Sequence, residues 1–243
     1  MAITNSEIDV NRIPSNISKI GFYTALLTTV ITVATFIVAY FTPPLSGPFC
    51  QNQPCYSYPY LDVVSRFPRD YLWMYPAIVL LIVYMMLMTA VYYGSPENKK
   101  IYSHIGLFFA VSAAMILIAD YFIQLSVVQP SLLKNETDGI SLLSQYNPHG
   151  IFIVLEDLGY FIMAIAFLFM APVFHGTKLK NVIRWVFIAS FLLTVFAFVY
   201  FTVTHGINRE YRFEIAAISI NWFTLIVSGI LLSIYFNKSK TSL

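Results

Sequence analysis

Charged residues are scarce in this chain of 243 residues, where Asp, Glu, Lys and Arg together make up only 11%. A water-soluble domain carries about 25%. The net charge is +2 and the charges are scattered along the chain, which argues against nucleic acid as a partner. Hydrophobic residues make up 58% of the chain, so the composition indicates a protein that resides in a lipid bilayer.

The chain also lacks the short motifs that mark common catalytic and cofactor sites. It contains no HExxH, GxSxG, Walker or CxxCH pattern. Its four histidines fall in loops or near the ends of apolar stretches, whereas haem ligands in a membrane bundle must face one another inside it. We therefore expect no cofactor and no metal site, and the sequence leans away from an enzyme.

Six apolar stretches divide the chain, and each is long enough to cross a bilayer, whose ~30 Å hydrocarbon core takes about 20 helical residues. In lipid each stretch must be a helix, because its backbone groups find no water to bond. The sequence therefore predicts an all-α integral membrane bundle that forms one domain over 1–243. The six spans are expected at about 20–41, 71–93, 101–128, 150–174, 182–204 and 213–236.

The loops between the spans carry their own signals. The segment 42–70 holds six of the twelve prolines, so it cannot be an α-helix, and we expect it to form an ordered outer loop. It also holds Cys50 and Cys55, the only cysteines. A disulfide is favoured over a metal pair, because the loop offers no further thiol or histidine ligand. Pro130 is expected to end or kink the third span, and Asn147 to cap the fourth helix with Pro148 at its first position.

The distribution of Lys and Arg predicts the orientation. Nine of these residues fall on one side of the predicted spans and five on the other, and the positive-inside rule then places both termini in the cytoplasm. The nine are Arg12, Lys19, Lys99, Lys100, Lys178, Lys180, Arg184, Lys238 and Lys240, and the five are Arg66, Arg69, Lys134, Arg209 and Arg212.

Two acidic residues lie deep inside predicted spans. Asp120 stands nine residues before Gln129, and Glu156 nine residues after Asn147, so both lie ~13 Å below the outer ends of their helices. By the same count Asn221 falls in their layer, while Gln124 and Tyr160 lie one turn away on the same faces and Asp157 points about 100° from Glu156. Intramembrane acids are functional candidates by default. The predicted ligand-binding or cation-binding residues are Asp120, Gln124, Glu156, Asp157, Tyr160 and Asn221.

Several roles are open for this polar layer. Paired carboxylates could bind a cation or share a proton, and the layer could also hydrogen-bond the polar end of an amphipathic ligand. A purely structural role is a clasp between helices, made by a protonated carboxyl and its amide or hydroxyl neighbours. A second polar set, near Asp70, is expected to form an outer rim of ion pairs or headgroup contacts. Its members are Arg66, Arg69, His149, Arg209, Arg212 and Glu214.

Two regions carry a resemblance to known sequences: DYFIQ at 120–124, and QYNPHG at 145–150 followed by LEDLGY at 155–160. They resemble uncharacterised prokaryotic multi-pass membrane proteins, over the middle third of the chain. The resemblance implies a bacterial or archaeal cytoplasmic membrane and brings no activity with it. In such a cell the glycosylation sequon at Asn135 would be without effect.

The sequence thus favours a multi-pass membrane protein that binds or transports a small cation, a proton or an amphipathic solute through a polar pocket in its outer half. A non-catalytic membrane sensor or assembly protein is the second reading, and a membrane-embedded lipid-modifying enzyme is the third. The expected partners are the lipid bilayer and an unidentified small solute or lipid, and the oligomeric state stays open.

Cysteine labelling from outside the cell tests the orientation. A membrane-impermeant thiol reagent should modify single cysteines placed within 42–70 or 131–149, because those loops are expected outside. It should leave cysteines at Lys99 and Lys178 unmodified until the membrane is permeabilised. Modification of the last two in intact cells would reverse the predicted topology.

Overall fold

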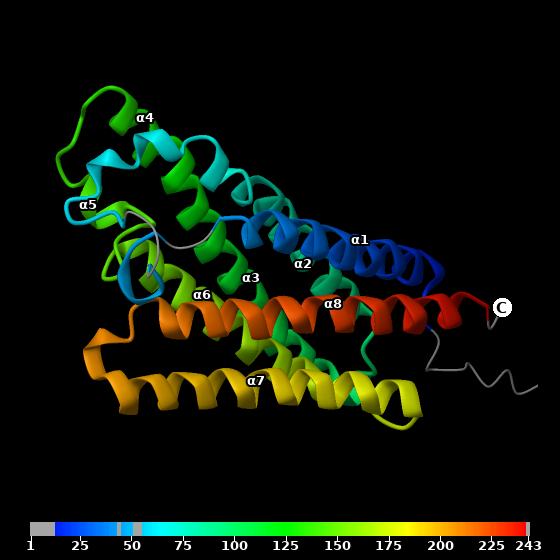
Figure 1. Cartoon of the computed structure of the whole chain (residues 1–243). Helices are drawn as coiled ribbons and strands as arrows, with labels where there is room; N and C mark the ends of the chain where they lie inside the picture. The colour runs from blue at the N-terminus through cyan, green and yellow to red at the C-terminus, as the bar shows by residue number, and fades with distance from the viewer. Residues whose placement is uncertain (1–12, 43–44, 51–54, 242–243) are drawn as a thin grey trace, which may run out of the picture.

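The computed structural model of this protein describes residues 13–42, 45–50 and 55–241 (Figure 1). Within these ranges the chain folds almost entirely into helices and forms no strand. Six of the helical segments are long and apolar enough to cross a membrane. The predicted all-α fold with six membrane spans is therefore confirmed.

The long helices are separated by short connections, except at one end of the bundle. Two short helices, α4 (Gln129–Leu133) and α5 (Ile140–Leu143), lie at that end with the described part of residues 42–70 (Figure 1). We call it the loop end. The long helices are α1 (Ser15–Tyr40), α2 (Met74–Tyr93), α3 (Lys100–Ile123), α6 (Ile151–Met170), α7 (Lys178–His205) and α8 (Tyr211–Thr241).

Five of the long helices form a closed ring of contacts. Helix α1 packs against α2 and α8, α2 packs against α3, α3 packs against α6, and α6 packs against α8. Helix α7 lies outside this ring, against α6 and α8, at the edge of the bundle in Figure 1. The first residues of α1 and the last residues of α8 lie side by side, at the end of the bundle opposite the loop end (Figure 1).

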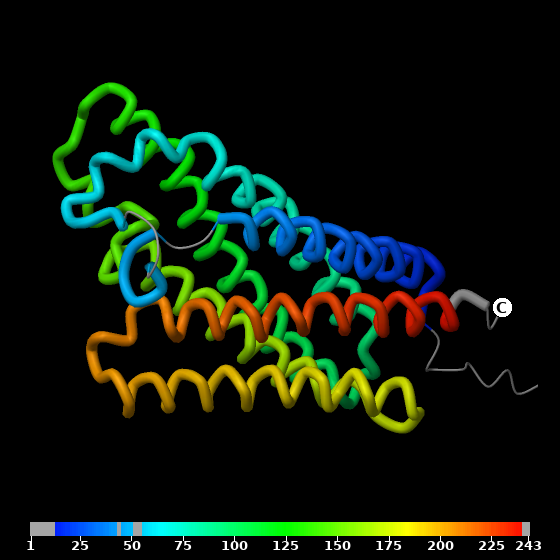
Figure 2. Tube along the Cα trace, viewed as in Figure 1, coloured from blue at the N-terminus to red at the C-terminus, as the bar shows by residue number. Residues whose placement is uncertain are grey.

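Glycines allow two of these helix pairs to approach closely. A Cβ atom on Gly229 of α8 would lie 2.3 Å from Thr29 Oγ1 of α1, and one on Gly21 would lie 2.6 Å from the Phe236 ring. On α6, a Cβ on Gly159 would lie 2.5 Å from Leu117 of α3. Small residues permit such approach in lipid, where hydrophobic association is weak. The contacts join α1 and α8 away from the loop end, and toward that end the two helices separate (Figure 2).

The third span does not end at Pro130, as the sequence suggested it could. Helix α3 continues through a π-helical stretch, Gln124–Val128, directly into α4, where Pro130 occupies the first turn. A proline removes one backbone donor and its ring presses on the preceding turn. The wider π-turn before it relieves that crowding, so the helix passes through the proline.

The predicted cap of the fourth helix is also wrong. Helix α6 begins at Ile151 with Gly150 as its N-cap residue, and not at Asn147. The side chain of Asn147 instead accepts a hydrogen bond from the backbone N–H of His149, at 3.0 Å. This is an Asx turn, which uses the capping ability of asparagine one turn before the helix begins.

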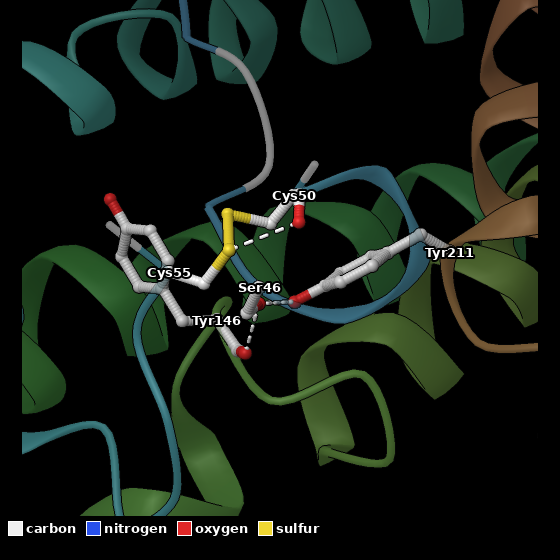
Figure 3. The surroundings of a disulfide bond; sticks show 5 residues. All are labelled: Ser46, Cys50, Cys55, Tyr146 and Tyr211. Atoms are coloured by element: carbon white, nitrogen blue, oxygen red, sulfur yellow. Dashed lines mark hydrogen bonds between the residues drawn. A yellow bond between two sulfur atoms is a disulfide. The ribbon is translucent and has the colours of Figure 1, made fainter. Parts of the chain in front are cut away.

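The loop 42–70 contains no α-helix in its described part. It forms three short 3-10 turns, Gly47–Phe49, Leu61–Arg66 and Arg69–Tyr71. Cys50 and Cys55 form the predicted disulfide, which lies beside Ser46 and Tyr146 (Figure 3). Ser46 Oγ donates a hydrogen bond to the carbonyl of Tyr146 and lies 2.7 Å from Tyr211 Oη. The loop is thereby tied to the segment before α6 and to the start of α8.

Alkylation tests the disulfide in solution. Protein purified without reductant should take up no iodoacetamide after denaturation, because both cysteines are bonded to each other. After reduction it should take up two equivalents, which intact mass spectrometry measures. Two alkylated cysteines in the unreduced protein would show that the bond does not form.

Candidate functional site

Three buried carboxyl groups from three helices lie within electrostatic range of one another near the loop end. They belong to Asp120 of α3, Glu156 of α6 and Glu214 of α8, and we call them the acid cluster. Their exposed fractions are 1%, 1% and 9%. The side chains of Glu156 and Glu214 lie close to each other, and Asp120 lies within electrostatic range of both. The structure thus brings together the two predicted acids and adds a third.

A chain of aromatic donors leads to Glu156. Trp222 Nε1 donates to Tyr160 Oη, Tyr160 and Tyr121 are joined through their hydroxyls, and Tyr121 Oη donates to Glu156 Oε1, each at 2.9 Å. An indole N–H can only donate, and the proton of Tyr121 is used on Glu156. The proton of Tyr160 therefore points to Tyr121, so every bond in the chain is directed toward Glu156.

Glu156 and Glu214 differ in the donors that reach them. Two carboxylates cannot hydrogen-bond unless one of them carries a proton. Hydrogen bonds donated to a carboxylate stabilise its ionised form, and Glu156 is the one that receives the bond from Tyr121. Glu156 is therefore the member of the pair that accepts from the donor chain, and Glu214 is the one that lines the cavity described below.

Three other predicted residues lie apart from this hydrogen-bonded network. Asn221 turns back on its own helix and donates to the carbonyl of Ala217, at 2.8 Å. Gln124 forms hydrogen bonds to the segment before α6. Its side-chain N–H donates to the carbonyl of Leu143, and its side-chain oxygen accepts from the backbone N–H of Gln145 at 3.1 Å. Gln124 therefore anchors the loop end and does not bond to the acids.

Asp157 points to a different neighbour from Glu156, as the helical wheel suggested. One of its oxygens lies 3.9 Å from Arg209 Nη2. The guanidinium of Arg209 also lies over the ring of Phe198, 4.7 Å from its centre. Asp157 thus joins α6 to the connection between α7 and α8.

Glu214, expected at the rim, lies in the acid cluster, and Asn221 lies deeper than its predicted layer. The depth count assumed comparable helix ends on three spans, but α6 begins at Ile151 and α8 at Tyr211. Glu156 is therefore five residues into its helix and Glu214 three residues into its own. Their side chains meet, whereas Trp222, next to Asn221, reaches Tyr160 one turn further in.

The remaining rim residues form ion pairs at the loop end. Arg66 Nε lies 2.7 Å from Asp70 Oδ2 and Arg69 Nε lies 3.1 Å from Asp70 Oδ1. Burial alone lowers the pKa of Arg66, but the hydrogen bond and the charge of Asp70 outweigh it and raise the pKa above its usual value. On the other side of the rim, Glu210 lies 3.8 Å from His149 and 3.4 Å from Arg212.

Tyr146 is a further partner of Asp70 in this group of ion pairs. Its hydroxyl donates to Asp70 Oδ2 at 2.7 Å. Burial raises the pKa of Tyr146, and its hydrogen bond to Asp70 acts in the same direction, so the hydroxyl stays protonated and remains a donor. Asp70 therefore has two cations and one phenol as partners, and its charge is fully compensated.

A cavity of about 380 Å³ lies between α1, α8 and the loop end. Glu214 and Asp70 contribute its two carboxyl groups, and Gln145 and Ser219 are among its other polar residues. Seven of the sixteen lining residues are aromatic. The aromatic residues are Phe36, Tyr40, Trp73, Tyr146, Phe152, Tyr211 and Trp222.

The charge of the acid cluster has no cationic partner in the described part of the chain. No Lys, Arg or His of residues 13–42, 45–50 and 55–241 forms an ion pair with Asp120, Glu156 or Glu214. The same ranges contain no group of three His, Cys, Asp or Glu side chains arranged to hold a metal ion. Asp120 Oδ2 also lacks a hydrogen-bond partner there.

The sequence argument did not single out Tyr121 and Trp222. Each stands next to a residue that it did name, Asp120 and Asn221 respectively. Successive residues on a helix point about 100° apart, and the choice between neighbours depends on how each helix is rotated in the bundle. An aromatic with a polar tip next to a polar residue inside a predicted span is the signal that could have found them.

No family model, curated protein or solved structure matches the chain.

A pair of tyrosine substitutions tests the donor chain. Tyr121→Phe removes the donor to Glu156 Oε1 and the acceptor of the Tyr160 hydroxyl, and a buried polar group left unpaired costs about 1–3 kcal/mol. Tyr84→Phe is the matched control, because Tyr84 is equally buried and its hydroxyl has no hydrogen-bond partner among the described residues. Thermal unfolding of the purified proteins should show a melting temperature lowered by about 2–4 °C per kcal/mol for Tyr121→Phe alone. Equal shifts in both variants would contradict the donor chain.

Proposed function

We propose that this protein binds a small organic cation in the cavity at the loop end and moves it through the membrane. Glu214 supplies the opposing charge. The observation that carries the proposal is the placement of Glu214, whose carboxyl group lines an aromatic cavity and has no cation beside it.

Charge compensation distinguishes the two carboxyl groups of the cavity. Asp70 is already paired with Arg66 and Arg69, so it offers little attraction to a further cation. An ionised Glu214 without a partner would be unfavourable, because a buried charge needs a counter-charge. A cationic ligand would supply it.

The aromatic wall favours an organic ammonium group as that cation. Trp and Tyr rings attract cations through their negative faces, and quaternary ammonium ions are commonly held in this way. Trp73, Trp222 and Tyr211 line the same cavity as Glu214. The walls can therefore stabilise a bulky, weakly hydrated cation that carboxylates alone would hold loosely.

Binding of a cation at Glu214 would displace the proton that it shares with Glu156. The carboxyl groups of Glu156, Asp157 and Asp120 lie within electrostatic range of Glu214. In this proposal the bond donated by Tyr121 keeps Glu156 ionised, so the displaced proton leaves the cluster. Cation binding would then be coupled to proton release, which is the basis of exchange transport.

The orientation and the location belong to the same proposal. The excess of Lys and Arg at the end opposite the loop end supports cytoplasmic termini, and the resemblance of residues 120–160 supports a prokaryotic cytoplasmic membrane. The cavity would then face the outside of the cell.

Two alternative functions make different predictions. An assembly protein would co-purify with partners and be indifferent to changes in the acids, and a lipid-modifying enzyme would show turnover that depends on a carboxylate.

Binding of benzyltrimethylammonium to the protein in nanodiscs tests the cation site. Trp73 and Trp222 line the cavity, so intrinsic fluorescence reports binding. Glu214→Gln should weaken binding at least about 30-fold, since removal of one partner of a buried charge pair costs about 2–5 kcal/mol. Affinity of the native protein should fall as the pH is lowered, because protons compete with the cation for Glu214, and the variant should lose this dependence.

Glu97→Gln is the matched control, because Glu97 is exposed and lies at the opposite end of the bundle, beside Lys100. It should bind the probe like the native protein. Equal affinity of Glu214→Gln and the native protein would refute the cation site.

A further inference from the structure

The cavity is elongated along α8. Its lining residues on that helix run from Tyr211 to Trp222, which is a length of ~16 Å at 1.5 Å per residue. The hydrocarbon core of a bilayer is ~30 Å thick. The cavity therefore extends from the loop end to about the middle of the membrane.

The polarity of the cavity changes along this length. Asp70, Gln145 and Tyr146 lie at the loop end together with Glu214, whereas Phe36, Ile218 and Trp222 line the deeper part. A bilayer changes in the same order, from polar headgroups to hydrocarbon. The cavity thus offers polar and charged groups at headgroup depth and an apolar wall at acyl-chain depth.

One long side of the cavity is open between α1 and α8. Several residues that line it are also exposed on the outside of the bundle, including Tyr40 at 76%, Phe36 at 44% and Ile215 at 36%. The two helices separate toward the loop end (Figure 1). Phe36 and Trp222 meet edge to face across the gap, with ring centres 6.0 Å apart. In a membrane this opening faces lipid.

We propose that the cavity takes its ligand sideways from the adjacent bilayer leaflet, through the gap between α1 and α8, and that this ligand is an amphiphile with an ammonium head and an alkyl chain. This inference rests on the proposed function and adds the ligand class and its route. The head would lie against Glu214, and the chain would lie along Ile218 and pass out between the helices.

The volume and the charges support this class of ligand. A cavity of about 380 Å³ is at the small end of ligand sites, which range over roughly 300–1,000 Å³. It has room for a head and the first part of a chain, and the open side lets the remainder stay in lipid. An anionic head is disfavoured, because Arg66 and Arg69 are already paired with Asp70.

Selectivity must come from the head of the amphiphile. A chain that leaves lipid for an apolar wall gains little, because lipid tails are as apolar as the wall. The chain instead keeps the ligand in the leaflet, where it reaches the opening at high local concentration. Amphiphiles with the same chain and different heads should therefore bind very differently.

Photo-crosslinking in nanodiscs tests the inference. Two probes carry the same dodecyl chain with a diazirine at its middle, one with a trimethylammonium head and one with a neutral maltoside head. The ammonium probe should label the halves of α1 and α8 near the loop end, around Phe36 and Ser219, at least tenfold more than the maltoside probe. Ser219→Trp should reduce this labelling at least tenfold, because Ser219 lines the opening.

Ile230→Trp is the matched control, since Ile230 is exposed on α8 outside the cavity, and it should label like the native protein. Equal labelling by both probes would overturn the inference. So would binding of benzyltrimethylammonium that depends on Glu214 but is unaffected by Ser219→Trp, without labelling by the ammonium amphiphile. That result would leave the cation site in place, reached from water. Loss of all dependence on Glu214 would remove both proposals.

Discussion

The contact between the carboxyl groups of Glu156 and Glu214 is the interaction on which the rest of the site depends. Two acids can be buried side by side only if they share a proton or receive enough donors. The structure supplies donors: Tyr121 donates to Glu156, and behind it Tyr160 and Trp222 point in the same direction. Glu214 is left as the member of the pair that lines the cavity.

The packing of the bundle explains why this contact can lie beside an opening. Close approach at Gly21 and Gly229 holds α1 to α8 away from the loop end, and Gly159 holds α6 to α3. Near the loop end no glycine brings α1 onto α8, and the two helices meet there through the rings of Phe36 and Trp222. The bundle is thus closely packed where α1 and α8 approach at their glycines, and it leaves a cavity between the same two helices near the loop end.

The loop end closes the site from above by hydrogen bonds and ion pairs. Asp70 gathers Arg66, Arg69 and Tyr146, and Gln124 bonds to the backbone at Leu143 and Gln145. These residues satisfy polar groups that would otherwise be buried without partners. The charges of Arg66 and Arg69 are balanced by Asp70, so these arginines do not compensate the acid cluster.

The sequence by itself determined the properties that depend on local physics. The length of each apolar stretch and the need to satisfy every backbone group fixed six helices, the two cysteines had only each other as partners, and the position of Asp120 and Glu156 inside apolar stretches marked them as buried acids. The tertiary structure alone decided which side chains meet. Helices such as α2 and α8 have no face that is clearly more apolar than the others, so periodicity does not reveal the buried face, and the rotation and start of each helix are set by packing. For this reason Glu214 lies with the acids and Gln124 with the loop end, where residue counting placed them the other way.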